Sequence, residues 1–329
     1  MTSAAEDVFV PRRGLRGGHL QTLAGHFLRP RNLLPQPERR LFQMEEGAQV
    51  RCECNWQPER AAVPTAVIVH GLEGSSESSY VVGTANKAWA AAMNVVRMNV
   101  RNCGGTEALA PTLYHSGLSA DIGVIVQELI ARDGLPRIAL VGFSMGGNQV
   151  LKLAGEWGDK APREVRAIAA VCPGMDLAAS ATALHRPANR IYEMRFLLSL
   201  RAAMKRKSKL FPGRYHRPSL HTLRSIRHFD NEITSRYCGF TDAEDYYARA
   251  SASPLVGRIT VPTLVIHSKD DPFVRLTPPT RAALLANPKV RLIEPAHGGH
   301  CGFVGEPDGD DGRWAERRLV EFFRQQCQV

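Results

Sequence analysis

The segment that most constrains the fold is a serine between two glycines, placed directly after an apolar run. The run covers residues 137–141, and Ser144 lies between Gly142 and Gly146. The pattern predicts a buried strand, a tight turn and a helix over about 148–157. Such a turn lifts the serine hydroxyl above the end of the strand, and a Cβ at either glycine would clash there. We interpret the segment as a nucleophile elbow; a plain glycine-rich turn is the alternative.

Much of the remaining chain alternates between apolar runs typical of buried strands and helical patterns. The predicted strands are 41–44, 50–56, 65–69, 94–100, 137–141, 166–172, 263–267 and 290–294. The predicted helices are 81–92, 118–132, 148–157, 278–286 and 313–326. This alternation predicts an α/β fold with a mostly parallel central sheet and helices on both faces.

One long stretch, residues 174–254, interrupts the alternation because it contains no strand signal. It follows the strand that comes after the nucleophile helix, so it should leave the sheet at its carboxyl edge, beside the serine. A lid over an active site is typically inserted there. We predict one domain over residues 1–329 with a helical lid at about 174–254. The alternative is an excursion that only covers the edge of the sheet.

A nucleophilic serine needs a base within hydrogen-bond reach and an acid that orients the base. Two later loops, each after a predicted strand, supply these groups in the order serine, acid, histidine. In the first loop we favour Asp271 as the acid, because the chain turns at Pro272, and we expect Asp270 to cap that turn. In the second loop we favour His300 as the base, because two glycines free the backbone before it. His297 then shapes the loop.

Two backbone N–H groups are needed to bind the oxyanion of the reaction. We assign them to Met145, directly after the serine, and to Leu72, in the glycine-rich loop after the first buried strand. That loop is not followed by the Gly-Lys-Ser/Thr of a phosphate loop, so no nucleotide is expected. A metal site made of the two aspartates and two histidines would leave the elbow unexplained. We therefore expect neither a cofactor nor a metal.

The cysteines and the N-terminal residues indicate the cellular compartment that we expect for the protein. Seven scattered cysteines do not form a disulfide framework, which favours a reducing, cytoplasmic compartment. Residues 1–13 contain two acids and no apolar core, so a signal peptide is not expected, and no apolar run is long enough to span a membrane.

The net charge is +10, but ten Lys and Arg lie within residues 195–229, which contain no acid. The net charge of the rest of the chain is close to zero, which argues against a general nucleic-acid-binding protein.

The basic segment, residues 195–229, belongs to the predicted lid. It begins with apolar residues among arginines, and Lys205, Arg206 and Lys207 follow. A basic amphipathic helix can lie on an anionic membrane surface or attract an acidic substrate. A run of charge is more often only the solvated face of a helix, so both interpretations stay open.

With these site residues and loops, the chain resembles the YheT-like branch of the α/β-hydrolase family, and the resemblance extends over nearly its whole length. The matching motifs are at residues 17–22, 70–74, 114–117, 121, 142–147, 229–230, 239–240, 245–247, 270–273 and 297–303. The resemblance places the acid on Asp271 and the base on His300, in agreement with the loops. It implies hydrolysis of carboxylic esters; some members act on acylglycerols and some transfer acyl groups to alcohols. One departure is Asn102, where relatives usually carry glycine.

The sequence therefore predicts a cofactor-free serine esterase that acts on a small-molecule ester. Ser144 would attack the ester, His300 would move the proton, Asp271 would hold the imidazole, and the N–H groups of Leu72 and Met145 would bind the oxyanion. Two other functions stay open: an acyltransferase that uses an alcohol in place of water, and a non-catalytic scaffold that binds a partner through the basic lid.

Overall fold

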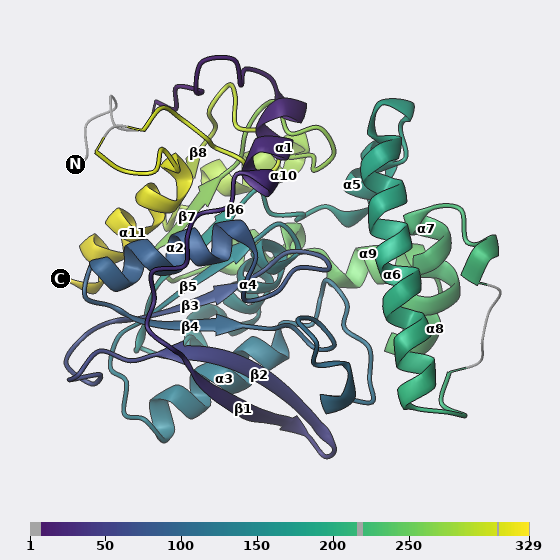
Figure 1. Ribbon diagram of the computed structural model, residues 1–329, viewed down its shortest axis with the longest axis horizontal. Helices are drawn as coiled ribbons and strands as arrows, with labels where there is room; N and C mark the ends of the chain where they lie inside the picture. The colour runs from purple at the N-terminus through teal and green to yellow at the C-terminus, as the bar shows by residue number, and fades with distance from the viewer. Residues whose placement is uncertain (1–7, 216–219, 308, 329) are drawn as a thin grey trace.

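The computed structural model describes residues 8–215, 220–307 and 309–328. Parts of two sequence-based interpretations lie outside the described residues: positions 1–7 of the N-terminal segment, and 216–219 within the basic segment. An eight-stranded sheet forms the centre, in the order β1-β2-β4-β3-β5-β6-β7-β8 (Figure 1). Strands β1 and β2 pair antiparallel with each other, β2 pairs antiparallel with β4, and the remaining pairs are parallel. The predicted α/β fold with a mostly parallel sheet is confirmed.

Every predicted strand and helix is present, with its ends displaced by a few residues at most. The strands are β1 Glu38–Glu45, β2 Ala48–Asn55, β3 Thr65–Val69, β4 Asn94–Met98, β5 Ile138–Phe143, β6 Val165–Val171, β7 Thr263–Ile266 and β8 Val290–Ile293. The helices on the sheet are α2 Ser79–Ala90, α3 Ala120–Ala131, α4 Met145–Trp157, α10 Pro278–Ala286 and α11 Trp314–Cys327. Outside residues 174–254, the described chain contains one α-helix that was not predicted: α1, Gly18–Phe27.

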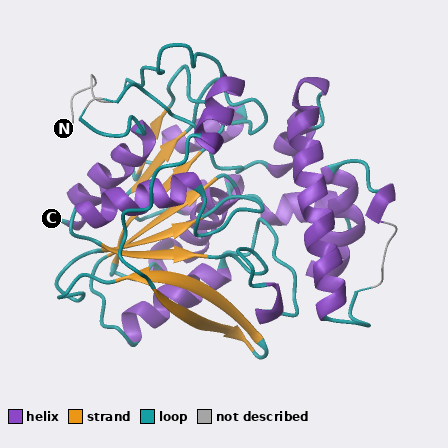
Figure 2. Cartoon of the chain, in the orientation of Figure 1, coloured by secondary structure: helices purple, strands orange, loops and turns teal. Residues whose placement is uncertain are grey.

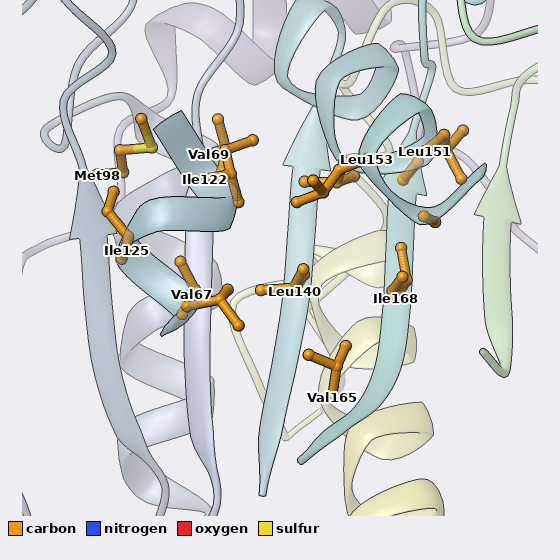
Figure 3. Packing of buried hydrophobic residues seen from close by; sticks show 14 of the residues in the cluster. Val67, Val69, Met98, Ile122, Ile125, Leu140, Leu151, Leu153, Val165 and Ile168 are labelled. Carbon is orange, nitrogen blue, oxygen red and sulfur yellow. The ribbon is translucent and has the colours of Figure 1, made fainter. Parts of the chain in front are cut away.

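The core lies on both faces of the sheet. On one face, Val67, Leu140 and Ile168 from neighbouring strands pack beneath Ile122 of α3 and Leu151 of α4 (Figure 3). On the other face, α2 and α11 cover the alternate side chains of the same strands. The central strands β3, β4 and β5 are buried along their whole length, which explains the continuous apolar runs of β3 and β5.

Residues 174–254 form a separate helical layer, called here the helical insertion. Its helices are α5 Leu177–Leu184, α6 Arg190–Leu210, α7 Ile226–Phe229, α8 Ser235–Cys238 and α9 Ala243–Ala250. Figure 2 shows that its described part contains no strand and lies beyond the tips of the central strands. A cluster of its apolar side chains also takes in Phe273 and Val274 from the loop after β7. The insertion therefore sits over the carboxyl edge of the sheet.

No helix within the described ranges has both the length and the apolar character that crossing a bilayer requires.

Candidate active site

Ser144 lies in a sharp turn between β5 and α4. Its φ of 54° and ψ of −115° lie in a region that residues other than glycine rarely occupy. The Ser144 N–H donates to the carbonyl of Val171 at 2.9 Å, which holds the turn against the next strand. A Cβ added to Gly142 would lie 2.1 Å from the Gly146 carbonyl oxygen, and one on Gly146 would lie 2.5 Å from that of His70. Both glycines are therefore sterically required, and the turn has the predicted geometry.

The loops after β7 and β8 bring Asp271 and His300 to this serine. The Nε2 atom of His300 lies 2.8 Å from the Ser144 hydroxyl, and its Nδ1 atom lies 2.7 Å from a carboxylate oxygen of Asp271. With the hydrogen on Nδ1, the imidazole donates to the carboxylate and accepts from the hydroxyl. Three residues distant in the sequence thus form one continuous chain of hydrogen bonds.

Asp271 is buried, and its second carboxylate oxygen accepts the N–H groups of Phe273 at 3.1 Å and Val274 at 2.9 Å. Burial alone would raise the pKa of this carboxyl. The charge and hydrogen bond of His300, with help from His267 and the Val274 N–H, outweigh that effect and lower the pKa below its usual value. Asp271 is therefore ionised and able to orient an imidazole.

The second acid and the second histidine form a pair of their own. A carboxylate oxygen of Asp270 lies 3.2 Å from Nδ1 of His297, and the other accepts the N–H of Gly299 at 2.8 Å. The expectation that Asp270 caps its own turn is wrong, because Asp271 takes those N–H groups. Asp270 instead ties its loop to the loop that carries His300.

Helix α1 supports the same histidine loop from the N-terminal end of the chain. The N–H of His300 donates to the Thr22 hydroxyl at 2.9 Å. The Gln21 side chain accepts the N–H of Val304 at 2.8 Å and donates to its carbonyl at 3.0 Å. A Cβ on Gly25 would lie 2.7 Å from the Cα of Gly302, so the two backbones are in close contact. Sequence analysis missed this support, although residues 17–22 stood out as a motif.

The loop after β3 lies beside the serine, since a Cβ on Gly71 would lie 3.1 Å from the Ser144 Cβ. Burial lowers the pKa of His70 to about 4, although its hydrogen bond to Gly71 opposes the shift, so the ring is neutral at pH 7. The neutral ring donates from Nδ1 to the Gly71 carbonyl at 2.7 Å and accepts the Val100 N–H at 3.0 Å. The Tyr80 hydroxyl accepts the Gly71 N–H at 3.0 Å. His70 and Tyr80 therefore fix this loop, a role that sequence analysis did not assign.

The two predicted oxyanion donors both border the cavity that contains the serine. Leu72 and Met145 line it together with Ser144. Within the described residues, neither backbone N–H donates to another protein group. These N–H groups are therefore free to bind an oxygen atom that carries developing negative charge.

The cavity has a volume of about 160 Å³ and lies between the serine and the helical insertion. Most of its wall is apolar and includes Leu72, Leu184, Phe196, Leu200, Phe273 and Val274. One polar group in the wall is the Glu73 carboxylate, which accepts hydrogen bonds from the hydroxyls of Tyr114 at 2.6 Å and Ser199 at 2.7 Å. The cavity suits an apolar group next to a reacting carbonyl.

Lys207 of the insertion also borders this cavity, and only 1% of its surface is exposed. Its ammonium donates to the Asn102 side chain and to the carbonyls of Glu107 and Ala110. Burial lowers its pKa to about 8, which the neighbouring Glu107 partly opposes. Neither interpretation of the basic segment anticipated a buried cation. Asn102, the departure from the family pattern, is one of its three acceptors.

Replacing Lys207 with methionine should destabilise the protein by about 1–3 kcal/mol, because buried acceptors lose their donor. The matched control is Lys205→Met on the same helix, an exposed position where the change should stay within about 0.5 kcal/mol. Denaturant unfolding of both variants measures the two effects. Equal stabilities would contradict a structural role for the Lys207 ammonium.

One group of side chains in the described ranges could share a metal ion: Cys172, His300 and Cys301, with their ligand atoms within 4.8 Å of one another. This group includes the histidine whose two nitrogens already contact Ser144 and Asp271. A bound metal would compete with that chain of hydrogen bonds. The alternative metal site considered from the sequence, with two aspartates and two histidines, is not such a group in this part of the structure.

Comparison with known proteins identifies the family. The family model for the α/β-hydrolase fold matches residues 64–307. The chain is 34% identical over 325 residues to YheT, a candidate esterase of Escherichia coli strain K12, covering 98% of this chain and 94% of that protein. It is 28% identical over 271 residues to the monoacylglycerol lipase of Saccharomyces cerevisiae, covering 80% of this chain and 59% of that protein.

Among solved structures, the fold is similar to that of the 2,6-dihydroxy-pseudo-oxynicotine hydrolase. The TM-score is 0.60 at 16% sequence identity, and the alignment covers 94% of this chain and 71% of the other. At this identity the likeness concerns the fold alone. The family model and the identity to YheT show that the chain belongs to the α/β-hydrolase fold family, as a carboxylic ester hydrolase of its YheT-like branch.

Proposed function

We propose that this hydrolase cleaves small-molecule carboxylic esters through a covalent acyl-enzyme on Ser144. The observation that carries the proposal is the continuous hydrogen-bond chain from the Ser144 hydroxyl through His300 to Asp271, beside an apolar cavity. A serine hydroxyl becomes a strong nucleophile only when a neighbouring base takes its proton. The 2.8 Å contact between His300 and the Ser144 hydroxyl supports His300 as this base.

In the proposed mechanism, the Ser144 oxygen attacks the ester carbonyl while its proton passes to Nε2 of His300. The ionised Asp271 holds the Nδ1 hydrogen and stabilises the imidazolium. The N–H groups of Leu72 and Met145 bind the oxyanion. His300 then protonates the departing alcohol, and a water molecule, activated by the same imidazole, releases the acid and restores the serine.

The proposed substrates are short- to medium-chain acyl esters or acylglycerols. The apolar wall of the cavity favours an acyl chain, and its modest volume favours a limited chain length. The similarity to a yeast monoacylglycerol lipase supports an acylglycerol as one of the candidates. We further propose that the helical insertion acts as a lid, because its residues form much of the cavity wall.

A hydrolysis profile tests the proposed substrate class. We expect kcat/KM for p-nitrophenyl esters to peak between acetate and decanoate and to fall towards palmitate, and monoacylglycerols of similar chain length to be cleaved. A maximum at palmitate, or a rate independent of chain length, would contradict the limited acyl pocket. Added ethanol measures acyl transfer in the same assay: ethyl esters forming faster than free acid would favour the acyltransferase alternative.

A further inference from the structure

The positive charge of this protein is concentrated in two segments that are distant in the sequence. Residues 8–37 contain five arginines and no acid, and residues 177–229 contain 12 Lys and Arg with one acid, Glu193. Glu193 is buried, and its carboxylate contacts the His185 ring and accepts the Ile226 N–H. The remaining 25 Lys and Arg stand against 31 acids. The two segments therefore account for the whole positive excess of the chain.

The same two segments expose large apolar side chains. Seven of the 13 exposed large apolar residues in the described ranges lie on α1, on the residue that ends it, or on the first half of α6: Leu20, Leu23, Phe27, Leu28, Ile191, Met194 and Leu198. On each helix three of them are spaced i, i+3, i+7, so each helix carries an outward apolar stripe. The most exposed are Ile191 at 76% and Phe27 at 67%.

The two stripes belong to one surface, because the helices that carry them are in contact. The Nη2 atom of Arg195 on α6 donates to Nε2 of His26 on α1 at 2.7 Å. The Tyr192 hydroxyl of α6 hydrogen-bonds to Nδ1 of His19 on α1 at 3.0 Å, and the two rings stack. Figure 1 locates α1 above the sheet and α6 as the long helix of the insertion. We call the surface formed by these two helices the α1–α6 face.

The α1–α6 face lies close to the catalytic histidine. The rings of Tyr192 and Phe273 are 5.0 Å apart, and those of Phe273 and His300 are 4.4 Å apart. The inward side of α6 also forms part of the cavity wall through Phe196 and Leu200. A molecule that docks on this face therefore lies beside the active site.

We propose that the α1–α6 face docks the enzyme on an anionic lipid surface. Exposed arginines accompany the stripes at positions 29, 31, 186, 190 and 195, without an exposed acid in either segment. Amphipathic helices that lie in a lipid interface combine these two features: apolar side chains enter the acyl layer and cations bind the phosphates. Each cation near an anionic lipid surface strengthens the attraction of the protein to that surface. The Lys207 ammonium is buried and adds no charge to this surface. The proposed docking surface therefore differs from the Lys205–Lys207 cluster suggested by the sequence.

The docking proposal rests on the proposed function only for its purpose, which is to bring the active site to lipid-dissolved esters. Binding itself does not require catalysis. The Ser144→Ala protein should therefore bind vesicles as the wild type does, and failure of either proposal can be recognised separately.

Vesicle sedimentation tests the docking face. The full-length protein is mixed with vesicles of phosphatidylcholine alone, or of phosphatidylcholine with phosphatidylglycerol, at low and high salt. We expect binding to the anionic vesicles, and weaker binding at 1 M salt, where the screening length falls to ~3 Å. The double variant Phe27→Ser/Ile191→Ser should bind at least about tenfold more weakly, since each change removes one large apolar side chain from the interface.

The matched control is Leu41→Ser/Leu285→Ser, which alters two exposed leucines on β1 and α10, elements that do not form this face. It should bind as the wild type does, and circular dichroism checks that both double variants are folded. Equal binding to neutral and anionic vesicles, an equal loss in the control, or no binding would each overturn the proposal. A dimer that sedimentation velocity shows to dissociate in the Phe27→Ser/Ile191→Ser variant would overturn it too, and would assign the face to self-association.

Discussion

Replacing Ser144 with alanine should lower kcat for a soluble ester by roughly 10⁴- to 10⁶-fold, because the residue that forms the acyl-enzyme is lost. Covalent labelling by a fluorophosphonate probe should disappear as well. The fold should persist, since the backbone of the turn is held by the Ser144 N–H and by the two glycines rather than by the hydroxyl.

Ser180→Ala is the matched control for this prediction, because Ser180 also borders the cavity but makes no hydrogen bond to His300. It should keep its fluorophosphonate labelling. Labelling that survives in the Ser144→Ala protein would assign the nucleophile to another residue, and the proposed mechanism would fail with it.

The second large effect is expected at the acid and the base. His300→Ala removes the proton acceptor of Ser144, and Asp271→Asn places an amide where Nδ1 needs an anionic acceptor. Each change should reduce kcat by about 10⁴-fold, since an imidazole in the wrong tautomer cannot take the serine proton. Steady-state kinetics on a soluble ester measures both losses.

The neighbouring pair provides the internal control. Asp270→Asn and His297→Ala alter a contact that joins two loops and does not reach the serine, so they should mainly reduce stability, by about 1 kcal/mol. If either control lost as much activity as its neighbour, or if the two pairs exchanged their effects, the choice of Asp271 or His300 would be wrong.

The sequence was informative where local chemistry decides the structure. Strands such as β3 are continuous apolar runs because both faces are buried, and the turn at Ser144 requires its glycines whatever surrounds it. The loops with Asp271 and His300 could be located because the fold places them at the ends of parallel strands. Which of the two aspartates caps the turn could not be predicted in this way, because it depends on which loop lies opposite each carboxylate.

Helix α1 escaped prediction for a related reason. Its buried residues are Gln21, Ala24 and Gly25, and its large apolar residues point outward, so the usual inward apolar stripe is absent. Small side chains are needed there because the helix packs closely on the histidine loop. The burial of Lys207 could not be predicted either. A run of cations does not indicate which of them donates to the acceptors of a loop that is about 100 positions away in the sequence.

The contacts between α1 and the loop at 298–304 have a consequence for the order of synthesis. The hydroxyl of Thr22 and the amide of Gln21 are synthesised first, and their partners, His300 and Val304, follow 278 and 283 residues later. The imidazole reaches its place only when α1 and this loop meet. A nascent chain can fold its inner strands first, yet we expect it to stay inactive until the loop at 298–304 has left the ribosome and packed on α1.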